Sequence, residues 1–246
     1  MGSEMCIRDR YGLEPFIDKC KESVWKYEGM WEDFSHTVGF WADMKNPYVT
    51  YHNDYIESEW WALKEIWKKG LLYEGHKIVP YCPRCGTPLS SHEVAQGYKD
   101  VKERSAVVRF KVKGEDAYIL AWTTTPWTLP SNVALCVNPD EDYVKVTSKG
   151  YTYYMAAALV DTVLGEGAEI LEHYQGKDLE FKEYEPLFPY AEKRIGNKKA
   201  YYVVCDTYVT LTDGTGVVHI APAFGEDDAK VGRKYDLPFV QFVDGK

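Results

Sequence analysis

A short threonine-rich segment holds the densest group of side chains that could do chemistry in this sequence. Its three adjacent hydroxyl groups belong to Thr123, Thr124 and Thr125. Pro126 and Pro130 fix φ and lack an amide hydrogen, so we expect residues 122–132 to form neither a central strand nor a helix interior. The segment is therefore predicted to be a rigid loop at the end of a strand, a common place for catalytic residues. A turn whose hydroxyls satisfy only local backbone groups explains the composition equally well.

A second candidate group follows a glycine-rich turn, Gly-Thr-Gly-Val-Val-His-Ile-Ala-Pro at residues 214–222. This pattern predicts a strand on which His219 shares a face with Val217 and Ala221. A predicted helix then begins with three acids, Glu226, Asp227 and Asp228. A histidine can act as an acid or base near neutral pH. From the residues alone, a satisfied core histidine and acids that complement a helix dipole are the simpler interpretation.

Cys82 and Cys85 form the one recognisable pair among six cysteines. The spacing Cys-Pro-Arg-Cys-Gly is typical of a zinc-ribbon knuckle, because two thiolates so spaced can share one tetrahedral ion. A structural zinc takes four ligands, and His76 and His92 are further candidates at a non-standard spacing. A reduced or redox-active pair without metal stays open, although no βαβ pattern supports a thioredoxin-like role. The remaining cysteines are scattered in apolar segments, which predicts a reducing, cytoplasmic compartment.

Composition limits the classes of function that the chain can have. With 246 residues, 45% of them hydrophobic, the chain can form one large or two small domains with a core. A net charge of −9 argues against a strong non-specific nucleic-acid binder, but it is compatible with docking of one RNA end on a local basic patch. The sequence has no run of 18 apolar residues and no secretory signal pattern, so neither a membrane span nor export is predicted.

Helical periodicity dominates the first part of the chain. Apolar residues at helical spacing predict helices over residues 13–27 and roughly 30–40. A third helix is predicted to start at Asn53 as N-cap and to end with Gly70 at C′. The adjacent tryptophans 60 and 61 are predicted to pack in a core.

From Ser105 onward the apolar period changes to two, which is typical of strands. Short strands are predicted over residues 107–113, 118–122, 133–137, 143–147, 151–156, 168–173, 201–208 and 216–221. Helices fit residues 157–164 and 226–235. The chain is therefore predicted to be α+β, with an N-terminal helical piece, a zinc-ribbon-like knuckle and a truncated β-barrel-like domain.

The threonine loop and the Val-Ala-Leu-Cys-Val-Asn-Pro that follows it resemble the editing domain of the isoleucyl-tRNA synthetase family. The related valyl and leucyl enzymes have an arginine where this chain has Thr125. Further resemblances follow in order at residues 41–51, 81–98 and 214–228, so the resemblance spans roughly residues 11–246.

The resemblance implies a division of the chain into segments. The expected segments are a non-native leader at 1–10, the helical part of a class I catalytic core at 11–74, a zinc-ribbon-like connector at 75–100 and a C-terminally incomplete editing domain at 101–246. The second cysteine pair of the family's zinc site follows the editing domain, so Cys82 and Cys85 correspond to half a site.

The resemblance also implies a reaction and roles for residues. The reaction is hydrolysis of the ester between a wrong amino acid, chiefly valine, and the 3′-terminal adenosine of isoleucine tRNA. Asp228 would bind the α-ammonium, and His219 would reject isoleucine by bulk or serve as the general base. The three threonines would hydrogen-bond the adenosine, the attacking water and the carbonyl oxygen. Asn132 and Trp127 are further substrate-binding positions.

Two class I signatures, His-Ile-Gly-His and Lys-Met-Ser-Lys-Ser, do not occur in this sequence. We therefore expect no amino-acid activation by this segment, with ATP and Mg²⁺ serving the full-length isoleucine-tRNA ligase only. The expected partners are the acceptor end of isoleucine tRNA and mischarged valyl-tRNA, bound by a monomer away from membranes. A non-catalytic tRNA-acceptor-binding module and an inert truncated product remain alternatives.

Overall fold

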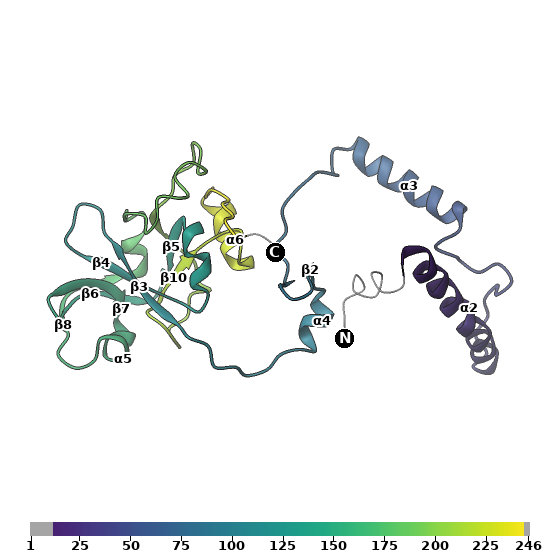
Figure 1. Cartoon of the computed structure of the whole chain (residues 1–246), viewed down its shortest axis with the longest axis horizontal. Coiled ribbons are helices and arrows are strands. Elements are labelled where there is room, and N and C mark those ends of the chain that lie inside the picture. The colour runs from purple at the N-terminus through teal and green to yellow at the C-terminus, as the bar shows by residue number, and fades with distance from the viewer. Residues whose placement is uncertain (1–11, 244–246) are drawn as a thin grey trace. The chain divides into compact units, whose positions relative to one another are not determined.

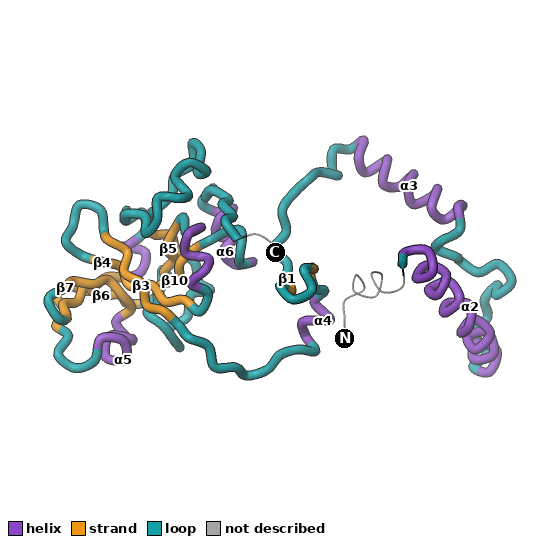
Figure 2. The backbone as a smooth tube through the Cα atoms, in the orientation of Figure 1, coloured by secondary structure: helices purple, strands orange, loops and turns teal. Residues whose placement is uncertain are grey.

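The computed structural model describes residues 12–243, so the predicted leader and the turn at 244–246 lie outside the described residues. The chain divides into two compact units (Figures 1 and 2). One comprises Met1–Lys77 with Tyr81–Leu89, and the other comprises Ile78–Pro80 with Ser90–Lys246. None of the helices within 12–243 is long and apolar enough to cross a membrane.

The first unit contains two long helices, α2 (Leu13–Thr37) and α3 (Asn53–Lys68). The two helices predicted over residues 13–27 and 30–40 are one continuous helix. A single glycine at position 29 does not break it, since an interior glycine costs a helix only about 1 kcal/mol. The N-cap prediction was also wrong, because His52 precedes α3 and Asn53 is its first helical residue.

The C-terminal end of α3 has the predicted glycine geometry. Gly70 has φ +69, and its amide donates to the Trp67 carbonyl at 2.8 Å. The next amide, of Leu71, donates to the Ile66 carbonyl at 3.3 Å. These two bonds form a Schellman motif, which requires a residue that adopts positive φ without strain.

The predicted core packing of Trp60 and Trp61 was wrong. Their side chains are 67% and 66% exposed, and no residue of α2 or α3 is buried. Periodicity predicts that a helix has an apolar stripe, but burial also needs a partner surface. Within the described residues of this unit, no element covers that stripe.

The second unit contains one eight-stranded sheet. Its strands are β3 (Ala106–Lys111), β4 (Tyr118–Thr123), β5 (Ala134–Val137), β6 (Asp142–Ser148), β7 (Tyr151–Ala156), β8 (Glu169–Gln175), β9 (Tyr202–Cys205) and β10 (Val217–Ile220). They are ordered β8-β6-β7-β4-β10-β5-β9, with β3 paired to β4. β9 ends at Cys205, three residues before the predicted end. The sheet is mixed, because β4 is antiparallel to β3 but parallel to β7 and β10.

Residues 181–185 close part of this sheet into a ring. The Phe181 amide donates to the Val203 carbonyl of β9 at 2.8 Å. The Glu185 amide donates to the Lys111 carbonyl of β3 at 2.8 Å. The segment therefore connects the two ends of the series β3-β4-β10-β5-β9, which gives the curled, barrel-like form that the short strands predicted.

Short helices complete the unit. They are α4 (Ser91–Ala95), η1 (Pro126–Ser131), η2 (Ala157–Leu159), α5 (Val160–Leu164), η3 (Gly176–Leu179) and α6 (Glu226–Lys234). The helix predicted over 157–164 is thus a 3₁₀ turn followed by one α turn.

The core of the second unit has two parts, on the two faces of β5. Leu135 and Val137 belong to the larger apolar cluster, whereas Ala134 and Cys136 belong to a second cluster that includes Val231 of α6. Successive side chains of a strand point to opposite faces. Both faces of β5 are therefore covered, and α6 is held against one of them, close to the end of β10.

Candidate active site

The threonine segment is partly helical. β4 ends at Thr123, and Pro126–Ser131 form the 3₁₀ helix η1. The prediction that residues 122–132 form neither a central strand nor a helix interior was therefore wrong at both points, because β4 includes Trp122 and Thr123, and Pro130 lies inside η1. Pro126 is the first residue of η1, where an amide hydrogen has no partner within the helix, and Pro130 lies in its second turn.

Hydrogen bonds within the segment fix the positions of its hydroxyls. Thr123 is buried, and its hydroxyl accepts from the Thr125 amide at 3.0 Å. The Thr128 hydroxyl donates to the Thr125 carbonyl at 2.8 Å. Thr124 and Thr125 are exposed, and the Thr125 hydroxyl also lies 3.4 Å from the Thr123 hydroxyl.

A hydrogen bond joins His219 to this segment. The His219 Nε2 lies 3.0 Å from the Thr128 hydroxyl, across 91 positions of sequence. Because that hydroxyl donates its own hydrogen to Thr125, it accepts from His219, which places the imidazole proton on Nε2. The other nitrogen, Nδ1, is buried and has no hydrogen-bond partner among the described residues. Burial lowers the pKa of His219 to about 4, so the ring is neutral at pH 7.

Asp228 lies in the first turn of α6, and its carboxylate contacts the backbone just after the end of β10. Its Oδ2 accepts from the Ala221 amide at 2.9 Å. Burial raises the pKa of Asp228 to about 6; the bond from Ala221 opposes this shift and the Asp227 charge adds to it. The Tyr208 hydroxyl faces the same carboxylate without completing a well-formed hydrogen bond. The carboxylate is thus mostly ionised at pH 7 and retains acceptor capacity.

Strand register brings these groups to one edge of the sheet. β10 runs parallel to β4 with Val218 opposite Trp122, so Thr123 and His219 follow at the carboxyl ends of both strands. The structure records no direct contact between Asp228 and either of them. Trp127, on η1, is 59% exposed. A neutral imidazole, a carboxylate and the hydroxyls of the threonine segment therefore lie at the carboxyl ends of β4 and β10.

Asn132 supports the segment through contacts within the protein. Its Oδ1 accepts from the Tyr184 hydroxyl at 2.6 Å, and its Nδ2 donates to the Ala134 carbonyl at 2.8 Å. Both side chains are buried. Asn132 thus connects the end of η1 to β5. A direct substrate contact by Asn132 stays a prediction.

Tyr184→Phe should destabilise the chain by about 1–3 kcal/mol, because it leaves the buried Asn132 oxygen without a donor. Tyr190→Phe is the matched control, since Tyr190 is 58% exposed and should change stability by less than about 0.5 kcal/mol. Chemical denaturation of the three proteins measures both effects. Equal stability of the Tyr184 variant and the parent would contradict the role given to this bond.

Three residues of this region were not among the sequence predictions. Thr128 lies three positions after Thr125, and that turn-like spacing was an available signal. Tyr184 and Tyr208 reach the site from segments distant in sequence, and no local pattern identifies them.

The cysteine pair lies in the other unit, on a hairpin formed by β1 (Tyr81–Cys82) and β2 (Thr87–Pro88). The Gly86 amide donates to the Cys82 carbonyl at 2.8 Å, and Gly86 has φ +67. Within residues 12–243, no group of three or more His, Cys, Asp or Glu side chains is placed to hold a metal ion. The donor set therefore fits at most half of a tetrahedral zinc site.

We expect the 246-residue chain to bind zinc weakly, with an easily exchanged ion that a chromogenic chelator removes at once. Two thiolates leave half of a tetrahedral ion uncoordinated. Cys82→Ser with Cys85→Ser should abolish the residual binding. One chelator-resistant zinc per chain would contradict this expectation, and His76→Ala and His92→Ala would then identify the additional ligands.

Comparison with known proteins agrees with the sequence resemblance. The chain is 61% identical over 239 residues to isoleucine–tRNA ligase of Clostridium acetobutylicum and 59% identical to that of Clostridium novyi, in each case over 97% of this chain and 23% of the relative. The corresponding Bacillus thuringiensis protein is 52% identical over the same shares. The chain thus spans about 23% of the length of these curated relatives.

Solved structures that match part of the chain include GlLeuRS-CP1, with a TM-score of 0.45, 17% identity and coverage of 53% of this chain and 60% of that one. Another is the editing domain of the P. knowlesi cytosolic leucyl-tRNA synthetase, with a TM-score of 0.43, 15% identity and coverage of 57% of this chain and 66% of that one. A family model described as class I tRNA synthetases (I, L, M and V) matches residues 2–215. Because this match covers most of the chain, the protein belongs to the class I tRNA synthetases.

Proposed function

We propose that the second unit carries an editing site. Its substrate is isoleucine tRNA wrongly charged with valine, and the site hydrolyses the ester that holds the valine. The observation that carries the proposal is the hydrogen bond from His219 to Thr128, which joins the end of β10 to the threonine segment. This bond joins the histidine to the segment that carries the exposed Thr124 and Thr125. The chain also has isoleucine–tRNA ligase relatives. For the full-length protein we propose isoleucine–tRNA ligase activity with ATP and Mg²⁺, and for this segment no amino-acid activation. Isoleucine tRNA as partner, a monomeric state and a cytoplasmic location belong to the same proposal.

Asp228 binds the α-ammonium of the aminoacyl ester in this proposal. One carboxylate oxygen is engaged by the Ala221 amide, which fixes the orientation of the group. A partly desolvated carboxylate interacts more strongly with a cation than an exposed one does. Asp227 is exposed and pairs with Lys230 at 3.0 Å, so it serves the helix end and not the substrate.

His219 acts by its bulk and not as the general base. A base must offer a lone pair to the attacking water. Its Nε2 carries a hydrogen that is donated to Thr128, and its Nδ1 is shielded from solvent. The fixed ring therefore limits the size of the amino-acid side chain that the site accepts.

The threonine segment positions the reacting atoms. Thr124 and Thr125 present exposed hydroxyls, whereas the buried Thr123 holds the Thr125 amide. Hydroxyl groups can orient a water molecule and bond a developing negative oxygen. The reaction adds water to the ester carbonyl and releases valine and the free 3′ hydroxyl.

The test is release of radiolabelled valine from valyl-tRNA by the full chain, beside a measurement of its RNA affinity. Faster release than spontaneous hydrolysis supports the proposal. Binding without acceleration would favour the non-catalytic acceptor-binding module, and absence of both with a non-cooperative melt would favour an inert product.

A further inference from the structure

The hydroxyl of Thr128 is held in one position by the backbone of the threonine segment. Thr128 is only 5% exposed, so its effect on a bound ester must pass through a neighbouring group. Its hydroxyl donates to the Thr125 carbonyl at 2.8 Å, and its amide donates to the same carbonyl at 3.0 Å. A threonine in a helical turn adopts this rotamer readily, because Oγ1 can bond a carbonyl of the preceding turn. The hydrogen of the hydroxyl is thus engaged, and its lone pairs are left for another donor.

The His219 ring supplies that donor. Its Nε2 lies 3.0 Å from the Thr128 hydroxyl, and its Nδ1 has no hydrogen-bond partner among the described residues. Buried N–H groups rarely lack an acceptor, so the proton belongs on Nε2 and not on Nδ1. The torsion that turns an imidazole about its Cβ–Cγ bond is broad, so the side-chain rotamer alone does not fix the plane of the ring. The bond to Thr128 fixes both the tautomer and the plane.

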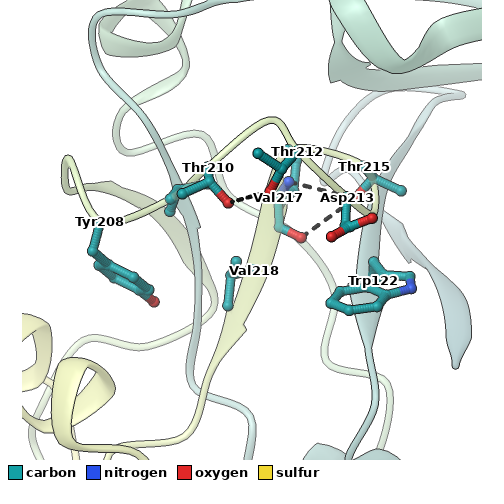
Figure 3. Close-up of a pocket in the computed structure, with 10 residues that line it drawn as sticks. Trp122, Tyr208, Thr210, Thr212, Asp213, Thr215, Val217 and Val218 are labelled. Carbon is teal, nitrogen blue, oxygen red and sulfur yellow. Dashed lines mark hydrogen bonds between the residues drawn. The ribbon is translucent and has the colours of Figure 1, made fainter. Parts of the chain in front are cut away.

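The opposite face of β10 offers the ring no further polar contact. Val218 precedes His219 in β10, and its side chain lines a cavity of about 250 Å³ together with Trp122 (Figure 3). Consecutive strand side chains point to opposite faces, so Val218 faces away from the imidazole. His219 is not among the described residues that line this cavity. Within the described part of the chain, the bond to Thr128 is therefore the polar contact that orients the ring.

We propose that Thr128 is a positioning residue for amino-acid specificity, because its hydroxyl holds the His219 ring in one tautomer and one plane. This inference rests on the proposed function and deepens it. A ring limits the size of a bound side chain only while it stays in place. A ring that turns yields space to the extra methylene of isoleucine, whereas a fixed ring does not.

A purely local role for the Thr128 hydroxyl is the alternative. Threonine hydroxyls commonly bond a carbonyl three or four residues before them, and such a bond serves the helical turn alone. The Thr125 carbonyl already accepts from the Thr128 amide, so the hydroxyl is not needed to satisfy it. A local role predicts that loss of the hydroxyl changes stability and leaves the tautomer of His219 as it was.

The test compares the full chain with Thr128→Val, Thr128→Ala, Thr128→Ser and the control Thr152→Val. Valine keeps the shape of threonine without the hydroxyl, alanine avoids placing a methyl group against the imidazole, and serine keeps the hydroxyl. Thr152 is also partly buried, with its hydroxyl 3.4 Å from that of Thr147. It adjoins Tyr153, which pairs with the first residue of β4, at the end of that strand away from the site.

The first readout is the tautomer of His219 at pH 7, from nitrogen-15 NMR of proteins labelled at histidine. The spectrum of His219→Gln assigns the signal among the six histidines. The parent, Thr128→Ser and Thr152→Val should each carry the proton on Nε2, whereas Thr128→Val and Thr128→Ala should show a mixture of tautomers. A proton on Nδ1 in the parent, or an unchanged tautomer in the hydroxyl-free variants, would overturn the inference. The parent spectrum decides the first point even where a variant does not fold.

The second readout is the ratio of kcat/KM for valine release to that for isoleucine release from the same tRNA. The ratio should fall by about three- to tenfold without the hydroxyl and stay within about twofold of the parent in Thr128→Ser and Thr152→Val. An unchanged ratio beside an altered tautomer would overturn the specificity role. An altered tautomer on a chain that does not hydrolyse valyl-tRNA keeps the positioning of the ring and rejects the proposed function. Hydrolysis with an unaltered tautomer does the reverse.

Discussion

Asp228→Ala should lower kcat/KM for valyl-tRNA hydrolysis by about ten- to two-hundredfold. A hydrogen bond to a charged group contributes on the order of 1.5–3 kcal/mol, and the variant leaves the substrate ammonium without its charged partner. The measurement is the initial rate of valine release at pH 7 over a range of valyl-tRNA concentrations. The matched control, Asp227→Ala, removes an exposed acid from the same helical turn and should change the rate by less than about threefold.

Asp228→Asn separates loss of activity from loss of folding. Burial raises the folded-state pKa of Asp228 to about 6 from an ordinary value of 3.8, so the fold favours the protonated form. Stability is therefore lost as the pH rises from about 4 through 6, when the carboxylate ionises. At pH 7 the asparagine variant should match or exceed the stability of the parent, by up to about 3 kcal/mol. An inactive but stable variant would place the effect in substrate binding.

His219→Ala should change which ester is cleaved. We expect hydrolysis of the valyl ester to continue and that of the isoleucyl ester to rise by tenfold or more. Steric exclusion of one extra methylene costs about 1–3 kcal/mol, and removing the imidazole ends that exclusion. The measurement compares valine and isoleucine release from the same tRNA, with a denaturation curve to confirm folding.

His219→Gln is the control that distinguishes bulk from base catalysis. A glutamine keeps a donor for Thr128 and much of the volume, but it cannot act as a base. The bulk interpretation predicts valyl hydrolysis within about threefold of the parent and continued rejection of isoleucine. If neither the alanine nor the glutamine variant hydrolyses the valyl or the isoleucyl ester, His219 acts as the general base.

The strand pattern of the second unit could be predicted because it depends on local alternation. Residues 151–156 were predicted as a strand and form β7 with those bounds. Helix ends were predictable where backbone geometry demands a residue type, as at Gly70. The exposure of Trp60 and Trp61 could not be predicted, because periodicity does not reveal whether a partner surface exists.

The candidate residues could be named from sequence, but their arrangement could not. The contact between His219 and Thr128 spans 91 positions and depends on the parallel register of β4 and β10. Tyr184 meets Asn132 only because residues 181–185 connect β9 to β3. Such contacts arise from closure of the sheet, which no local pattern encodes.

The most direct test of the account is the pH dependence of valyl-tRNA hydrolysis by the parent and by Asp228→Asn. If the ionised Asp228 holds the ammonium, kcat/KM of the parent should rise with pH through about 6, after subtraction of spontaneous hydrolysis. The His219 pKa of about 4 places protonation of that ring below this range. The asparagine variant should be slow and lack the rise near pH 6. An unchanged rise in the asparagine variant, or a flat parent profile between pH 5 and 7, would contradict the role of Asp228.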